Sequence, residues 1–260
     1  MLEIDDGSPM VAFAGDWHGR DTGLEEKLQR LSGNGITRLV HAGDFTICPD
    51  RSGSLFLDRV NSWAESTGIR IGVTSGSHKD WGHLQTAFAA GDGNPVEIRS
   101  HIAALPRGYR WTQRGRRFVS YGGVASIASK SQVTDPSWWR DELPTPAEFA
   151  ALEAGGTAEV MITHDSPVPG TPKVDAIRRS SNHWSDDALI YAELGSRGIT
   201  AAWEAVHPDL LIHGHFHVQD EITLVSGQRI ISLAAENEPG NVLLLNLDTL
   251  QTNWLEETDA

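Results

Sequence analysis

The sequence has little of what marks secreted or membrane proteins. Cysteine occurs once in 260 residues, at Cys48, so no internal disulfide can form and a reducing compartment is favoured. The longest apolar runs, such as residues 242–245, are far shorter than the roughly 20 residues of a membrane-spanning helix. The acidic, polar N-terminal residues do not resemble a signal peptide. We therefore expect a cytoplasmic protein that does not associate with membranes.

Positive charge is also scarce. The chain has 21 Lys and Arg residues against 35 Asp and Glu residues, which gives a formal net charge of −14. Such a surface repels phosphate backbones and argues against extended DNA or RNA as a partner, although a nuclease with a local basic groove stays compatible. A chain of this length can bury enough apolar surface to fold without disulfides or structural metals. We expect a single domain over residues 1–260.

The first half of the chain alternates between apolar, strand-like runs and amphipathic, helix-like segments. The expected strands are residues 11–15, 38–43 and 69–76, and the expected helices are residues 22–32, 53–65 and 83–91. This order predicts parallel strands joined by right-handed crossovers.

The middle of the chain loses this periodicity. Residues 109–123 are typical of a hairpin that turns near Arg114. Residues 126–146 are interpreted as an irregular surface loop. Thr145 and Pro146 then have the types that favour a helix start, as N-cap and first-turn residue.

The last third returns to the α/β pattern. We expect strands at 158–164 and 209–215, a loop at 165–184, helices at 185–198 and 199–207, and hairpins at 221–234 and 241–256. The whole pattern predicts an α/β fold in which two packed, mixed β-sheets form a β-sandwich flanked by helices.

Metal-ligating side chains follow several of the predicted strands. These candidates, all competent ligands for a divalent metal, are Asp16, His18, Asp44, His164, His215 and His217. Strand ends are rigid, and open α/β sheets gather their chemistry where strands end. Each residue alone has an ordinary structural explanation, as a turn aspartate or a hydrogen-bonded histidine. The repeated arrangement predicts a shared metal site.

Two of these motifs place ligands at alternate residues. Asp16 and His18 follow the first predicted strand, where neighbouring glycines let the backbone bend. His215 and His217 have the same spacing, but alternate side chains of an extended segment point to opposite faces. We therefore expect either a turn at Gly214 that redirects them or binding to different metals.

The motifs together resemble those of a known family. In chain order they are D-x-H at residues 16–18, G-D at 43–44, G-S-H at 76–78, a strand-end histidine at 164 and G-H-x-H at 214–217. The set resembles the calcineurin-like metallophosphoesterase superfamily over residues 11–217, most of the chain. The resemblance implies a metallophosphoesterase-like β-sandwich flanked by helices, in agreement with the pattern of predicted elements.

The resemblance also implies ligands and cofactors. One divalent metal would be held by Asp16, His18, Asp44 and His217, and a second by Asp44, His164, His215 and the residue at position 77, with Asp44 bridging. His78 would be the catalytic acid or a phosphate-contact residue. Mixed oxygen and nitrogen ligands suit Mn, Fe or Zn.

Two positions depart from the family pattern. The family has asparagine where this chain has Ser77, whose hydroxyl is a shorter and poorer donor, so the second metal should bind more weakly or sit differently. Ile47 stands where many relatives have a carboxylate or amide. Asp50 and Asp80 are then the candidates for orienting His78.

The implied activity is metal-dependent phosphoester hydrolysis. A hydroxide that bridges a dinuclear metal centre would attack phosphorus in line. We expect a phosphodiesterase that acts on a small phosphoester or nucleotide-like substrate. Arg20 is a candidate phosphate-binding residue, weighed against a solvated surface arginine. The alternative is a metal-binding, weakly active or inactive relative that acts by interaction, because Ser77 replaces the expected asparagine ligand.

Overall fold

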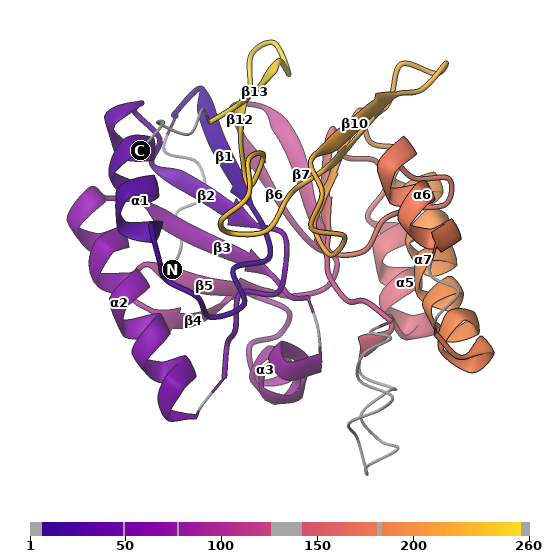
Figure 1. Ribbon diagram of the computed structural model, residues 1–260, viewed down its shortest axis with the longest axis horizontal. Helices are drawn as coiled ribbons and strands as arrows, with labels where there is room; N and C mark the ends of the chain where they lie inside the picture. Colours follow the sequence, from indigo (N-terminus) through magenta and orange to yellow (C-terminus); the bar gives the residue numbers. More distant parts are fainter. Residues whose placement is uncertain (1–6, 49, 77, 126–141, 181–183, 256–260) are drawn as a thin grey trace.

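A computed structural model of the chain describes residues 7–48, 50–76, 78–125, 142–180 and 184–255, and for residues 78–83 it describes the backbone alone. Two β-sheets pack face to face, and helices cover their outer faces (Figure 1). This arrangement confirms the predicted fold class. Among the described residues, no helix combines the length and apolar character needed to cross a bilayer.

The first sheet contains the N-terminal parallel strands. Its strands are β1 (Met10–Ala14), β2 (Arg38–His41), β3 (Arg70–Thr74), β4 (Val96–Arg99), β5 (Ile102–Leu105), β12 (Val242–Asn246) and β13 (Thr252–Trp254). They are arranged in the order β13-β12-β1-β2-β3-β5-β4. Strands β1, β2, β3 and β5 are parallel to their neighbours in this set, whereas β12 runs antiparallel to β1. The helices between them are α1 (Leu24–Gly33), α2 (Arg51–Thr67) and α3 (His78–Ala90).

The second sheet is formed by the later part of the chain. Its strands are β6 (Tyr109–Gln113), β7 (Arg116–Tyr121), β8 (Val160–Thr163), β9 (Leu210–His213), β10 (Asp220–Thr223) and β11 (Arg229–Ser232). Their order is β10-β11-β9-β8-β7-β6, with β7, β8, β9 and β11 parallel. The accompanying helices are α5 (Pro146–Ala154), α6 (Pro172–Ser180) and α7 (Asp186–Val206), which lie on the side away from the first sheet (Figure 1).

The alternation of side chains along each strand builds separate layers of core. In β1, Val11 and Phe13 point into the layer between the sheets, whereas Ala12 and Ala14 point toward the helix-covered face. In β8, Val160 faces the same central layer. Fully burying one such Val or Phe side chain contributes about 1.5–3 kcal/mol, and a shift by one residue would turn the whole set toward the helix-covered face, where alanines now pack. The core therefore fixes the register of the strands and the places where they end.

The loop predicted for residues 165–184 is wrong over Pro172–Ser180, which forms α6. Pro172 supplies a preset φ at the first turn, where a missing N–H costs nothing. The backbone N–H of Asp175 donates to the Thr171 carbonyl, and its carboxylate accepts from Gly170 N–H at 3.0 Å. These contacts stabilise a short helix whose proline and serine content is typical of a loop.

The two helices predicted for residues 185–198 and 199–207 form the single 21-residue helix α7. Gly195, inside this helix, is buried where the chain packs closely: a Cβ there would lie 2.7 Å from the Cβ of Ala125. Gly195 thus serves helix-to-loop packing, and Gly198, at the predicted break, also lies inside the helix. The antiparallel pair β4–β5 was not predicted, and it extends the first sheet beyond β3.

Three predicted hairpins are confirmed: β6 pairs with β7, β10 with β11 and β12 with β13. The predicted start of α5 is also confirmed, since the Thr145 hydroxyl accepts from Glu148 N–H while the Glu148 carboxylate accepts from Thr145 N–H at 2.7 Å. Of the irregular loop predicted at 126–146, residues 126–141 lie outside the described residues.

The parallel strands of both sheets end at a common edge. The Asp16 N–H after β1 donates to the Gly43 carbonyl after β2 at 3.0 Å. The Gly123 N–H after β7 donates to the Ser75 carbonyl after β3 at 2.9 Å, which joins the two sheets at this edge. Segments far apart in the sequence are brought together there.

Candidate metal centre

Asp16 connects three strand ends. Its backbone follows β1 and bonds to the segment after β2, while its carboxylate is fully buried. Both carboxylate oxygens accept from the backbone N–H of His215, at 3.1 and 3.0 Å, after β9. The side chain is therefore held in one orientation at the junction of the two sheets.

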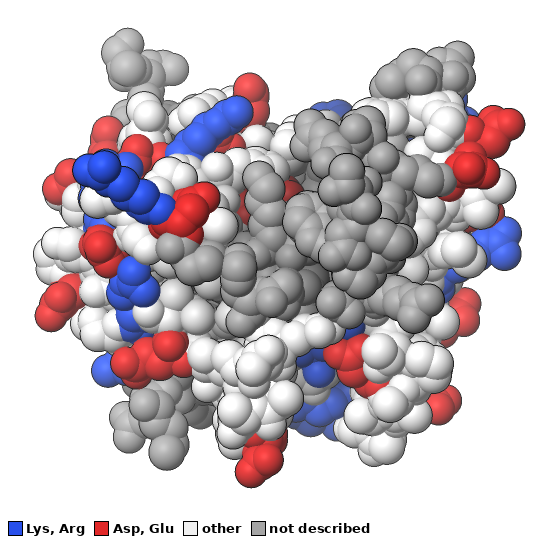
Figure 2. All heavy atoms as spheres, turned by 90° about the horizontal axis from the view of Figure 1, so that it is seen from below, with Lys and Arg blue, Asp and Glu red and all other residues white. Residues whose placement is uncertain are grey.

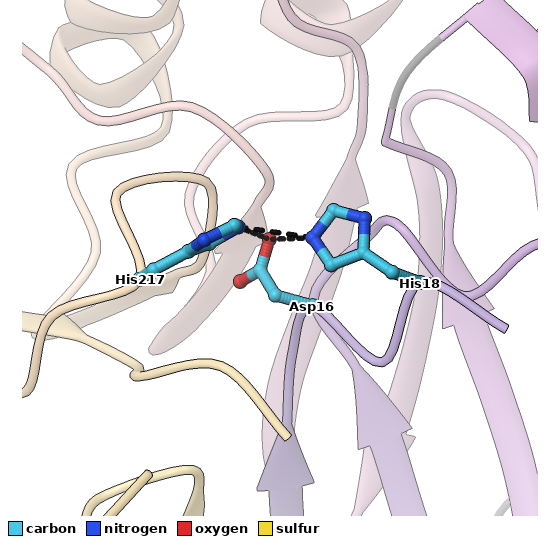
Figure 3. Close-up of side chains that lie close together, drawn as sticks. All are labelled: Asp16, His18 and His217. Carbon is cyan, nitrogen blue, oxygen red and sulfur yellow. Dashed lines mark hydrogen bonds and ion pairs between the residues drawn. The ribbon is translucent and has the colours of Figure 1, made fainter. Parts of the chain in front are cut away.

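A first cluster is formed by Asp16, His18 and His217 (Figure 3). The Nε2 atoms of His217 and His18 lie 3.4 and 3.9 Å from Asp16 Oδ1, and the two imidazoles flank the carboxylate. The two Nε2 atoms lie 2.9 Å apart. His18 and His217 are exposed, so the open side of this cluster faces solvent.

A second cluster is formed by Asp16, Asp44 and His164, whose ligand atoms lie within 4.8 Å of one another. His164 Nε2 lies 3.5 Å from Asp44 Oδ2, and His18 Nδ1 lies 3.8 Å from the same oxygen. Asp44 thus stands between histidines of both clusters, where a bridging ligand is expected, while Asp16 belongs to both clusters. The roles of these side chains as metal ligands stay predictions.

The hydrogen bonding of His164 indicates whether a cation would fit between this residue and Asp44. Its Nδ1 donates to the Ala42 carbonyl at 2.8 Å, and because a carbonyl only accepts, this nitrogen carries the proton. Nε2 is buried and has no hydrogen-bond partner among the described residues, yet it faces the carboxylate of Asp44. In the metal-free protein the Asp44 carboxylate favours a proton on Nε2, and a divalent cation between the two groups would replace that proton.

The pKa shifts indicate a site that attracts positive charge. Burial lowers the pKa of His164, but the nearby Asp44 carboxylate outweighs it, and the result is a pKa raised to about 10. The pKa of His217 is raised by its hydrogen bond to Asp16. In contrast, burial and the neighbouring His164 lower the pKa of His215 to about 3, so this ring stays neutral, as a metal-binding imidazole must be.

Several of the candidate ligands have a left-handed backbone conformation, which sets the direction of their side chains. Asp16, His18 and Asp44 have φ values of 56°, 49° and 53°, and His215 and His217 have 71° and 53°. Such conformations cost of order 1 kcal/mol or more for residues with a Cβ and cluster at functional sites.

The expected turn begins at Gly214, since the Phe216 N–H donates to the Gly214 carbonyl at 2.9 Å across His215. The backbone of His215 and His217 is itself left-handed, which redirects side chains that would otherwise point to opposite faces. Gly214 also provides space, because a Cβ there would collide with the carboxylate of Asp16.

Comparison with known proteins agrees with this geometry. The family model of the calcineurin-like phosphoesterases matches residues 9–219. The chain belongs to the calcineurin-like phosphoesterase family. This confirms the resemblance drawn from the motifs.

Solved structures share the fold of this chain at low sequence identity. TT1561 of Thermus thermophilus is 13% identical, with a TM-score of 0.56 and coverage of 94% of this chain and 97% of that one. A dimetal phosphatase from Danio rerio is 11% identical, with a TM-score of 0.57 and coverage of 92% of each chain. No curated protein sequence matches the chain.

The structure places the other predicted site residues as follows. The Arg20 guanidinium, although exposed, donates to the buried carboxylate of Glu236 at 2.7 Å, so a phosphate would have to share it with that carboxylate. Asp50 caps α2, because its carboxylate accepts from Gly53 N–H at 2.7 Å. Ser77 lies outside the described residues, as do the side chains of His78 and Asp80.

Asn241 supports the site but was missed from the sequence. Its side-chain amide donates to the carbonyls of Gly15 and Ala234 at 2.7 and 2.8 Å, and its oxygen accepts from the Trp17 indole at 3.2 Å. It therefore holds both residues that flank Asp16. The pair Trp17 and Asn241 is separated by 224 positions, and no motif surrounds Asn241 that would indicate this role.

Proposed function

We propose that this protein is a metal-dependent phosphodiesterase that uses a dinuclear centre on a small or nucleotide-like phosphoester. Membership of the family indicates a phosphoester hydrolase. The observation that carries the finer proposal is the pair of clusters that share Asp16, with the unpartnered Nε2 of His164 beside Asp44. Two adjacent sets of carboxylate and imidazole ligands are what a pair of cations requires.

The proposed ligand sets are those that the family resemblance implies, and each contains residues of one or both clusters. One metal would be held by Asp16, His18, Asp44 and His217, and the other by Asp44, His164, His215 and Ser77. Their oxygen and nitrogen donors suit Mn, Fe or Zn. When bound, such cations polarise the phosphoryl group and lower the pKa of a water molecule.

The chain itself orients these groups before substrate binds. The His215 N–H fixes the carboxylate of Asp16, and the Ala42 carbonyl fixes the tautomer of His164. In the proposed reaction, water attacks phosphorus in line and releases one proton to solvent, and the alkoxide departs on the opposite side. His78 donates the proton that the leaving oxygen requires.

The charge of the surface supports a small substrate. Figure 2 shows Lys and Arg side chains interspersed with Asp and Glu side chains around the margin of one face. A net charge of −14 adds an unfavourable field for a long polyanion. A compact phosphoester avoids most of this repulsion because only its phosphate must approach the cations.

The test is hydrolysis of bis(p-nitrophenyl) phosphate with added Mn²⁺ and with a chelator. Wild type should be active with Mn²⁺ and inactive after chelation, and His18→Ala should lower kcat/KM by roughly 10²–10³-fold because a charge-stabilising group is lost. His207→Asn is the matched control, since it removes an exposed imidazole at the left-handed C-cap of α7, which asparagine tolerates. Metal-independent hydrolysis, or equal losses in both variants, would contradict the proposal.

The second candidate is a metal-binding protein with little turnover, in which Ser77 weakens the second metal site. Restoring the family residue with Ser77→Asn should then raise Mn²⁺ occupancy or the rate of hydrolysis. An unchanged metal content and rate would contradict this account of Ser77.

A further inference from the structure

A pocket of about 300 Å³ adjoins the candidate metal centre. His215 and Phe216, from the segment after β9, form one wall, and Leu189 and Ala192 of α7 form another. Val168, which follows β8, contributes to the rim. The pocket therefore shares a predicted metal ligand, His215, with the phosphate-binding region.

The polar residues of the pocket already bind one another. Arg178 donates through Nη1 to the Pro167 carbonyl at 2.9 Å, and through Nη2 to the Ser166 carbonyl at 2.8 Å and the Ser196 hydroxyl at 3.1 Å. The buried Asp165 carboxylate accepts from Ser166 N–H at 2.7 Å and from the Ser196 hydroxyl at 3.1 Å. A ligand would have to break this network to bind the arginine as a counter-ion.

The aromatic wall is held in place from two sides. The guanidinium carbon of Arg178 lies 4.8 Å from the centroid of the Phe216 ring, within cation–π distance. The centroid of the His215 ring also lies 4.8 Å from it, in an edge-to-face arrangement. The Phe216 ring is thus fixed beside the predicted metal ligand and lines the pocket.

The remaining charge in the pocket disfavours anions. Glu193 of α7 lies in the lining and pairs with Arg197 at 2.7 Å, with both side chains exposed. An anionic group in the pocket would therefore meet a carboxylate and no unengaged cation among the lining residues described.

We propose that this pocket binds the organic group of the substrate and selects phosphoesters of an uncharged aromatic alcohol or nucleobase-like group. This inference rests on the proposed function and specifies its substrate class. The volume is at the lower end of small-molecule sites, which suits one ring system. A second phosphate group is disfavoured, so the selected ester carries its only charge at the scissile phosphate.

The test uses binding of three probes to the Mn²⁺-loaded enzyme by calorimetry: inorganic phosphate, methylphosphonate and phenylphosphonate, at a pH where both phosphonates are dianions. Phenylphosphonate should bind at least about tenfold more tightly than methylphosphonate, because its ring is removed from water in the pocket. Ala192→Trp fills the pocket and should abolish this preference while leaving the phosphate affinity unchanged. Ile190→Trp, at an exposed position of the same helix outside the lining, is the matched control and should keep it.

A second variant protects the test against misfolding of Ala192→Trp. Leu189→Ala enlarges the pocket and should weaken phenylphosphonate several-fold with little effect on methylphosphonate, in protein whose melting transition is intact. Equal binding of the two phosphonates by wild type, or a full preference in folded Ala192→Trp, would overturn the pocket assignment and leave the hydrolase proposal standing. Failure of inorganic phosphate to bind the Mn²⁺-loaded enzyme would overturn the proposed function and this inference with it.

Discussion

The carboxyl and amino ends of the parallel strands differ in backbone strain and in how their polar groups are hydrogen-bonded. At the carboxyl ends, Asp16, Asp44 and His215 have left-handed backbones, and Nε2 of His164 is buried without a hydrogen-bond partner among the described residues. These features cost stability and are retained where a cation can compensate for them.

At the amino ends of β7, β8 and β9, polar groups bond to one another. The Arg117 side chain donates to the Glu159 carboxylate between β7 and β8, and the Arg116 Nε donates to the Leu247 carbonyl at 2.8 Å. The Leu210 N–H, at the start of β9, donates to the Glu159 carbonyl at 3.0 Å. The comparison indicates that the carboxyl-end edge of the sheets is adapted to chemistry and the amino-end edge to stability. Substitutions at the carboxyl ends should therefore affect activity most, and substitutions at the amino ends should affect only stability.

The largest expected effect is that of Asp16→Asn. Asparagine has nearly the same shape but lacks the charge that both clusters share, so kcat/KM should fall by roughly 10²–10³-fold or more. The free energy of unfolding of the metal-free protein should fall by about 1–3 kcal/mol, because an amide NH₂ replaces one of the two oxygens that accept from His215 N–H. Denaturant titration and steady-state kinetics check this, and retention of wild-type activity would refute the role of Asp16.

An intermediate effect is expected for Gly43→Ala, at the carboxyl end of β2. Gly43 has φ 106°, and a Cβ there would collide with the ring of His164. We expect destabilisation of about 1–3 kcal/mol and a loss of Mn²⁺ affinity of at least about tenfold. Denaturant titration and calorimetric titration with Mn²⁺ measure the two effects.

The matched control is Gly35→Ala, before the amino end of β2. Gly35 has φ 74°, but a Cβ added there would meet nothing within 4 Å. Gly35→Ala therefore introduces the same kind of backbone strain as Gly43→Ala without a steric collision. Gly35→Ala should lower stability by about 1 kcal/mol and leave Mn²⁺ binding unchanged. If Gly43→Ala and Gly35→Ala lost Mn²⁺ affinity equally, the proposed difference between the carboxyl and amino ends of the strands would be contradicted.

The smallest effect is expected at the amino ends. The hydrogen bond from Arg117 lowers the pKa of Glu159 from 4.5 to about 2 in the folded protein. A depressed folded-state pKa gives stability that is present above pH 4.5 and is lost as the pH falls toward 2. In Glu159→Gln the free energy of unfolding should no longer fall over this acidic range. The difference from wild type should be about 1 kcal/mol or less, because solvent screens the pair. Thermal melts at several pH values measure it, and a fall in kcat/KM at neutral pH would contradict a purely structural role.

Much of the site could be predicted from the sequence because parallel strands share an edge. Asp16, Asp44 and His164 each follow an apolar run, and the fold brings these strand ends together. The left-handed backbone of His215 could not be predicted, since the residue types there do not require it.

Other features depend on contacts between distant segments. Asn241 holds the residues beside Asp16 through bonds that no local pattern indicates. Helix α6 was missed because its residues favour a loop, and its stabilising bonds involve residues beyond the helix, such as Pro167 and Ser166, which accept from Arg178. Local propensity gave way there to tertiary contacts.

The most direct measurement is anomalous diffraction from crystals of the wild-type protein grown with Mn²⁺ and phosphate. The account predicts two anomalous peaks at the shared edge, one among Asp16, His18 and His217 and one between Asp44 and His164, with phosphate against both. Saturating Mn²⁺ with no peak among these side chains, or peaks only elsewhere on the molecule, would contradict it.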